Sequence, residues 1–193
     1  MYHERSTPRH FILAAAWILL GLAIGLHLPD IDSRVNRLIP SWLLLHRSIL
    51  THGMIASLLL FWLLRKRGGV APSSRLFAIG MSLAVAVHLC FDFFPRGWAG
   101  FALIHVPVYG RTSALFSQSW VMLSIVVCLY LGFLLAENIA ELMLGFGNLI
   151  TSFAVSAVEN GRAILSAFIL LALATVVTII LARQARKAAA RRA

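Results

Sequence analysis

Long apolar runs are the feature that most constrains the fold of this chain. Hydrophobic residues make up 60% of its 193 residues and charged residues only 12%, against roughly 25% charged in an average soluble domain. Several runs reach the length of about 20 residues that an α-helix needs to cross a bilayer. The sequence therefore predicts an all-α, polytopic membrane helix bundle. Because no long polar stretch separates the runs, we expect a single domain over residues 1–193.

The expected helices cover these runs and end where proline or basic residues interrupt them. The residue before a proline resists the helical conformation, so helices should end before Pro29 and Pro95. The expected ranges are 11–28, 42–64, 74–94, 118–136, 142–158 and 163–182. The run 142–158 contains two glycines and Asn148, and it either crosses the membrane or lies flat on it. Five and six spans therefore both stay open.

Ionisable side chains collect at the ends of the first three runs. The chain has only seven acidic residues, and three of them lie there together with three histidines. Such groups at membrane depth are costly and usually functional. Because successive spans alternate in direction, the end of the first, the start of the second and the end of the third share one membrane face. The sequence therefore predicts a metal site at that face, with six candidate ligands: Asp30, Asp32, His46, His52, His88 and Asp92.

The ligand types and their spacing favour a transition metal. His88 and Asp92 are four residues apart, so both project from one helix face. Imidazole with carboxylate suits zinc, manganese or iron better than calcium. His46 and His52 cannot share a face of one straight helix, so His46 must precede the helix if both bind metal. Six ligands exceed the four of one tetrahedral zinc, so two or three ions are expected. Singly, each motif also fits a structural hydrogen bond or a loop cap.

The basic residues predict topology rather than nucleic-acid binding. The net charge is +10, but Lys and Arg stand beside the apolar runs, where they anchor helices and set orientation. With six spans, 11 of the 17 bases lie on the side of the termini, which should be cytoplasmic, and the site faces outside. With five spans, 10 of the 17 lie on the side of the site, which then faces inside. We favour six spans and an external site, and expect no nucleic-acid partner.

Four further polar residues rank below the six candidate ligands. Arg47 is a candidate for orienting ligands or holding a phosphate group, and Arg96 and Arg111 are candidates for binding an anionic headgroup. The alternative role of Arg47 is solvation of the helix start, and that of Arg96 and Arg111 is topology and membrane anchoring. His105 stands between two aliphatic residues and is better interpreted as a buried or interfacial histidine than as a ligand.

The motifs together resemble the YdjM-like family of inner-membrane metal-dependent hydrolases. The matching pieces cover about residues 17–115: Leu28-Pro29-Asp30-Ile31-Asp32, His46-Arg47-x-x-x-Thr51-His52 and His88-x-x-x-Asp92. The family is distantly similar to zinc-dependent phospholipase C and P1 nuclease, which are helical enzymes with clustered zinc ions that act on phosphoesters. The resemblance implies metal ligation by the same six side chains. Gly53 stands where a serine is common, and the C-terminal helices and basic tail, 137–193, lie outside the resemblance.

The resulting expectation is a hydrolase of a bacterial-type inner membrane that cleaves a phosphoester of a lipid or lipid-linked substrate. Metal-activated water would be the nucleophile, with Asp30, Asp32 or Asp92 as the proton acceptor and Arg47 beside the reacting group. A divalent-metal transporter is one alternative, although the run 55–64 offers only one polar side chain, Ser57, toward the opposite face. The other alternative is a non-catalytic assembly protein in which a metal ion holds helices together.

Overall fold

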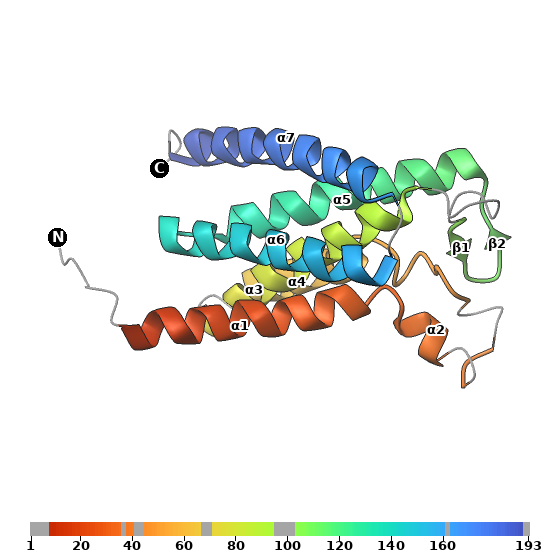
Figure 1. The fold of residues 1–193 in the computed structure, drawn as a ribbon, viewed down its shortest axis with the longest axis horizontal. Coiled ribbons are helices and arrows are strands. Elements are labelled where there is room, and N and C mark those ends of the chain that lie inside the picture. The colour runs from red at the N-terminus through yellow and green to blue at the C-terminus, as the bar shows by residue number, and fades with distance from the viewer. Residues whose placement is uncertain are drawn as a thin grey trace.

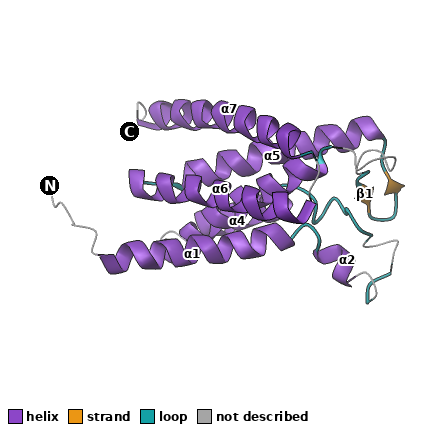
Figure 2. Ribbon diagram, in the orientation of Figure 1, coloured by secondary structure: helices purple, strands orange, loops and turns teal. Residues whose placement is uncertain are grey.

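The computed structural model describes residues 8–35, 38–40, 45–66, 71–94, 103–160 and 163–190. Within these ranges the chain is mostly helical, as predicted, and a two-stranded antiparallel hairpin is added (Figures 1 and 2). The helices are α1 (Pro8–His27), α2 (Ile31–Val35), α3 (Ile55–Lys66), α4 (Pro72–Asp92), α5 (Ala114–Leu135), α6 (Ile139–Asn160) and α7 (Ile164–Ala190). The strands are β1 (His105–Val106) and β2 (Gly110–Arg111).

Four of the described helices are long and apolar enough to cross a membrane. They are α4, α5, the part of α6 from Ile139 to Glu159 and the part of α7 from Ile164 to Ala185. The apolar segments of α1 and α3, Phe11–His27 and Ile55–Leu64, are shorter. These helices indicate a membrane protein, and the choice between five and six spans stays a prediction.

The segment before α3 departs from the sequence expectation. A helix over 42–64 was expected, but α3 begins at Ile55 and the described residues 45–54 form turns. The main chain around Ser48 is used by other partners: its N–H donates to the carboxylate of Asp32, and the neighbouring peptide groups pair with His105. Arg47 has a φ of 67°, a left-handed conformation that interrupts a helix. The expected helix start was therefore wrong, because tertiary partners replace helical hydrogen bonds here.

α4 is the central helix, and its contact with α1 depends on glycine. A Cβ atom at Gly80 of α4 would lie 2.0 Å from the carbonyl oxygen of Ile18. On α1, a Cβ atom at Gly21 would lie 2.2 Å from the carbonyl oxygen of Phe77. Gly25 follows Gly21 by four residues and meets α4 just as closely. Small residues at this spacing allow close backbone approach between membrane helices, so α1 and α4 form a fixed pair.

Successive long helices run in opposite directions, so the bundle has two distinct ends. α1 begins and α7 ends at one end, and α2 and the β1–β2 hairpin lie at the other (Figure 1). The end of α1, the segment before α3 and the end of α4 meet at the α2 end, as alternation predicts. Three segments that are distant in sequence therefore converge there.

A group of ion pairs ties α4, α5 and α6 together near the start of α4. Arg75 donates two hydrogen bonds to the carboxylate of Glu141, of 2.5 and 2.7 Å, and a third of 2.8 Å to the carbonyl oxygen of Leu135. Glu137 lies 3.1 Å from the same guanidinium group. Bidentate pairs of this kind fix geometry as well as charge. This group is structural, and it is separate from the histidine–carboxylate cluster at the other end of α4.

Candidate metal centre

The structure brings all six predicted ligand residues together at the α2 end of the bundle. The ring centroids of His46 and His52 lie 5.3 Å apart, and those of His52 and His88 lie 5.9 Å apart. His88 and Asp92 stand on the last turns of α4, four residues apart. His46 and His52 both precede α3, as is required if both are to bind metal.

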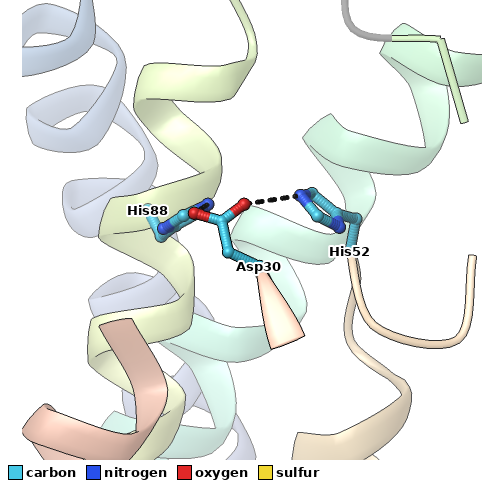
Figure 3. A group of neighbouring side chains, drawn as sticks. All are labelled: Asp30, His52 and His88. Atoms are coloured by element: carbon cyan, nitrogen blue, oxygen red, sulfur yellow. Dashed lines mark ion pairs between the residues drawn. The ribbon is translucent and has the colours of Figure 1, made fainter. Parts of the chain in front are cut away.

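Asp30 reaches this place because α1 ends beside Pro29. The next residues form a turn, and α2 begins at Ile31. The main-chain N–H and the hydroxyl of Ser33 both donate to the carbonyl oxygen of Asp30, at 3.1 and 2.7 Å. The Asp30 carboxylate lies between the rings of His52 and His88 (Figure 3). The turn after α1 therefore delivers an acidic side chain to the end of α4.

Asp30, His52, His88 and Asp92 form the inner group of the cluster. The Nε2 atom of His52 lies 3.6 Å from Asp30 Oδ1 and 3.5 Å from Asp92 Oδ2. The Nε2 atom of His88 lies 3.1 Å from Asp92 Oδ2 and 3.8 Å from Asp30 Oδ2. Ligand atoms about 2.1 Å from one tetrahedral ion lie roughly 3.4 Å from one another. The inner group has separations of this size, and three of its members, Asp30, His52 and His88, form a group that can hold a metal ion.

The Nε2 atom of His52 gives a second indication of a cation site. His52 is 1% exposed, and among the described residues its Nε2 atom has no hydrogen-bond partner. A buried polar atom without a partner is destabilising and calls for an explanation. Here it faces two carboxylates at slightly more than hydrogen-bond distance. A metal ion between these atoms would satisfy the imidazole and the carboxylates together.

Asp32 and His46 form an outer group on the opposite side of the His52 ring. Asp32 is fully buried, and its Oδ2 atom lies 3.3 Å from His52 Nδ1. The same oxygen accepts hydrogen bonds from the hydroxyl of Thr51, at 2.6 Å, and from the N–H of Ser48, at 3.0 Å. The other oxygen lies 3.1 Å from His46 Nδ1. Carboxylates in this position orient metal-binding histidines, and ligation by Asp32 and His46 themselves stays a prediction.

The cluster changes the protonation of the residues that it joins. Burial opposes ionisation of Asp32, but hydrogen bonds from the two histidines, Thr51 and Ser48 outweigh it and hold the pKa of Asp32 far below its usual range. Burial also opposes the charged form of His52, yet the surrounding carboxylates raise the pKa of His52 to about 10. The nearby imidazole of His52 lowers the pKa of Asp30. The carboxylates therefore favour the protonated form of His52 at neutral pH, and a metal ion at Nε2 would have to displace that proton.

The structure describes three of the four lower-ranked sequence candidates. Arg47 is half-buried, and its Nε atom has no hydrogen-bond partner among the described residues. Arg111 is exposed on β2, paired in register with His105. His105 is buried, and its main chain holds the 47–49 segment through hydrogen bonds of 2.8 and 2.9 Å. Arg96 lies outside the described residues.

Two residues of α5 that sequence reasoning missed contact the segment that carries His52. The indole N–H of Trp120 donates to the carbonyl oxygen of His52 at 2.9 Å. The hydroxyl of Ser124 accepts from the N–H of Met54 at 3.2 Å. The signal available in the sequence was their four-residue spacing on a mostly apolar helix.

A cavity of about 300 Å³ lies elsewhere, between α1 and α6. Its lining is mostly apolar, with Asn148 and Thr151 as its polar side chains, and it includes none of the six candidate ligands. Apolar pockets of this size bind apolar groups. This cavity is therefore separate from the histidine–carboxylate cluster.

No family model, curated protein or solved structure matches this chain. The resemblance of its motifs to the YdjM-like hydrolases stays an expectation.

Proposed function

We propose that this protein is a membrane-bound, metal-dependent hydrolase that cleaves a phosphoester of a lipid or lipid-linked substrate. The observation that carries the proposal is the inner group, in which two imidazole Nε2 atoms and two carboxylates converge at one end of an apolar helix bundle. Nitrogen and oxygen ligands in this mixture favour zinc, and they also accept manganese or iron. A bound ion would lower the pKa of water toward about 7 and neutralise charge on phosphate oxygens.

The burial of the carboxylates supports different roles for them. Asp92 is almost fully buried, whereas the side chain of Asp30 is 43% exposed. A group that takes a proton from water and releases it to solvent must be accessible. We therefore assign metal binding to Asp92, and metal binding together with proton transfer to Asp30. Asp32 orients His52, and with His46 it offers a place for a second ion.

The position of the inner group along α4 supports an enzyme over a transporter. Asp92 is the last residue of α4, and His88 lies one turn before it. A transporter needs its ligands near the middle of the bilayer and a polar path on both sides. Ligands at the end of a span instead lie close to the level of lipid headgroups. A phosphoester headgroup reaches this level while its acyl chains stay in the bilayer, and Arg47 and Arg111 are the nearby cationic candidates for holding it.

The proposed orientation puts the site outside a bacterial-type inner membrane. The residues up to Arg9, those from Arg65 to Arg75 and those from Arg183 onward carry 11 of the 17 Lys and Arg residues. The described parts of these segments lie at the end of the bundle away from α2 (Figure 1), and the positive-inside rule makes that end cytoplasmic. α3 has 12 residues and is only about 18 Å long, so it covers only part of a hydrocarbon core of about 30 Å.

The test is metal content and turnover in detergent-purified protein. Wild-type protein, H88A and the control E159Q, an exposed carboxylate on α6, are compared by elemental analysis and on a panel of lipid phosphoesters. We expect bound transition metal and phosphoester cleavage in wild type and E159Q, and loss of both in H88A. Wild-type protein without bound metal, or metal-loaded protein without turnover on the panel, would contradict the proposal. If metal removal lowers thermal stability and no turnover is found, the metal is a structural staple.

A further inference from the structure

One face of α5 holds the segments that surround the cluster. Ser117, Trp120, Ser124 and Cys128 follow one another at spacings of three, four and four residues, which places them on one side of the helix. Ser117 accepts a hydrogen bond from the N–H of Ile104, before β1. Ser124 accepts from Met54, and Cys128 contacts Ser57 at 3.5 Å. The described part of α5 therefore supports both the hairpin and the segment that carries His52.

Trp120 makes the contact closest to the metal ligands. Its indole N–H donates to the carbonyl oxygen of His52 at 2.9 Å. The indole also lies against Gly53, where an added Cβ atom would stand 2.5 Å from Nε1 and 2.9 Å from two ring carbons. The φ of Gly53 is not in the left-handed region, so the reason for glycine here is the close approach of the indole. Trp120 and Gly53 are therefore a matched pair.

Three contacts of His52 with residues other than its neighbour Thr51 help to determine where Nε2 lies. Its main-chain N–H donates to the carbonyl oxygen of Ser48 at 2.8 Å, and its carbonyl oxygen accepts from Trp120. Its Nδ1 atom faces Asp32. Metal sites require ligand placement within about 0.5 Å, which depends on the residues that support the ligands. Of the three contacts, only the one from Trp120 comes from a spanning helix.

We propose that Trp120 is a positioning residue, which fixes the His52–Gly53 peptide so that Nε2 of His52 faces Asp30 and Asp92. Trp120 thereby sets the metal affinity of the centre. This inference rests on the proposed metal centre. The attachment of residues 45–54 to α5, which the inference also requires, can be tested in metal-free protein.

The first experiment compares W120F with W17F in purified full-length protein. Phenylalanine keeps a ring at position 120 but removes the N–H donor, and Trp17 is a 39% exposed residue of α1 that serves as a matched control. We expect the Kd for zinc of W120F to rise by about 10-fold or more, the usual effect of losing a group that supports a ligand. In metal-free protein, amide hydrogen exchange in 45–54 should become faster, while exchange in α4 stays unchanged. W17F should match wild type in both measurements.

The other possible results of this experiment contradict either the role of Trp120 or the metal centre itself. If W120F binds zinc as tightly as W17F, or if exchange in 45–54 is unchanged, the inference is wrong. If wild-type protein binds no zinc, the metal centre is wrong, and the exchange comparison still decides whether Trp120 holds the segment. Size-exclusion profiles and thermal midpoints of each variant establish that it is folded.

A second experiment tests the packing of Trp120 on Gly53. The added methyl group of G53A meets the indole in wild type but has space in W120A. We expect G53A to weaken zinc binding in the wild-type background and to have a smaller effect in W120A, as coupled neighbours do. Additive effects of the two substitutions would contradict direct contact between the residues.

Discussion

The Oδ2 atom of Asp32 lies 3.3 Å from Nδ1 of His52, on the opposite side of the ring from the atom that faces Asp30 and Asp92. This relationship divides the acidic residues into two roles. Asp32 can fix the orientation and tautomer of His52, which leaves Nε2 for a metal ion. Asp30 and Asp92 face that ion directly. The two roles predict different effects of substitution.

Substitution D32N should weaken metal binding without removing a ligand of the inner group. Asp32 accepts hydrogen bonds from Thr51 and Ser48 as well as contacting the two histidines. An amide nitrogen in place of one oxygen faces donors, so a buried hydrogen bond is lost and His52 is less well oriented. We expect a 10- to 100-fold increase in the Kd for zinc, measured by competition with a chelator. E159Q is the control, and equal zinc affinity in the two variants would contradict the assignment.

Histidine substitutions should separate the inner group from the outer group. The ring of His88 belongs to the inner group, whereas His46 is 43% exposed and contacts the cluster through Asp32. We therefore expect H88A to abolish the tightest zinc site and H46A to retain it. Elemental analysis together with calorimetric titration measures both the number of ions and their affinity. A loss of one ion in H46A would identify Asp32 and His46 as ligands of a second ion, and loss of the tightest site in H46A would contradict the division.

Zinc binding should release a proton, and the apparent affinity should therefore rise with pH. The pKa of His52 is raised to about 10 in the metal-free protein, compared with 6.5 when unperturbed. This raised pKa stabilises the metal-free fold fully below about pH 6.5, and the contribution is lost as pH rises through 10. Zinc replaces the same proton, so binding is opposed at low pH and favoured at high pH. Calorimetry at pH 8 in two buffers of different ionisation enthalpy should detect about one proton released per ion. No release at this pH would show that Nε2 of His52 is not a ligand.

The convergence of the candidate ligands could be predicted from the sequence because the membrane restricts topology so strongly. Helices that cross in alternate directions bring the end of the first run, the start of the second and the end of the third to one face. The i, i+4 spacing of His88 and Asp92 then fixes their common side of α4. Joint metal binding by His46 and His52, six residues apart, likewise required His46 to lie in a turn before the second helix, and turns are found there. The spacing of residues within a helix and the alternating direction of successive helices were sufficient to predict these features.

The remaining features depend on contacts between distant residues, which periodicity does not contain. Residues 45–54 are non-helical because Asp32 and His105 satisfy the main chain around Ser48, and no local pattern indicates those partners. The contact between Trp120 and His52 joins residues 68 positions apart. The different roles of Asp30 and Asp32, two residues apart, depend on which side of the His52 ring each carboxylate reaches. By contrast, the Gly21–Gly25 spacing is a recognisable small-residue motif, and it could have predicted the close packing of α1.

Adding a methyl group at Gly80 should destabilise the fold at the contact between α1 and α4. A Cβ atom there would lie 2.0 Å from the carbonyl oxygen of Ile18 and 2.8 Å from its carbonyl carbon. These are backbone atoms of a packed helix, so G80A must push α1 away and lose contacts along the interface, at a cost of about 1–3 kcal/mol or more.

Gly147 of α6 is the matched control for G80A, since a Cβ atom there has no neighbour within 4 Å. G147A should be neutral or stabilising by up to about 1 kcal/mol, because alanine is the better helix former. Thermal unfolding in one detergent measures the difference, and a midpoint for G80A equal to that of G147A would mean that α1 and α4 are not packed this closely. Because α1 delivers Asp30 to the cluster, G80A should also weaken zinc binding, whereas G147A should not.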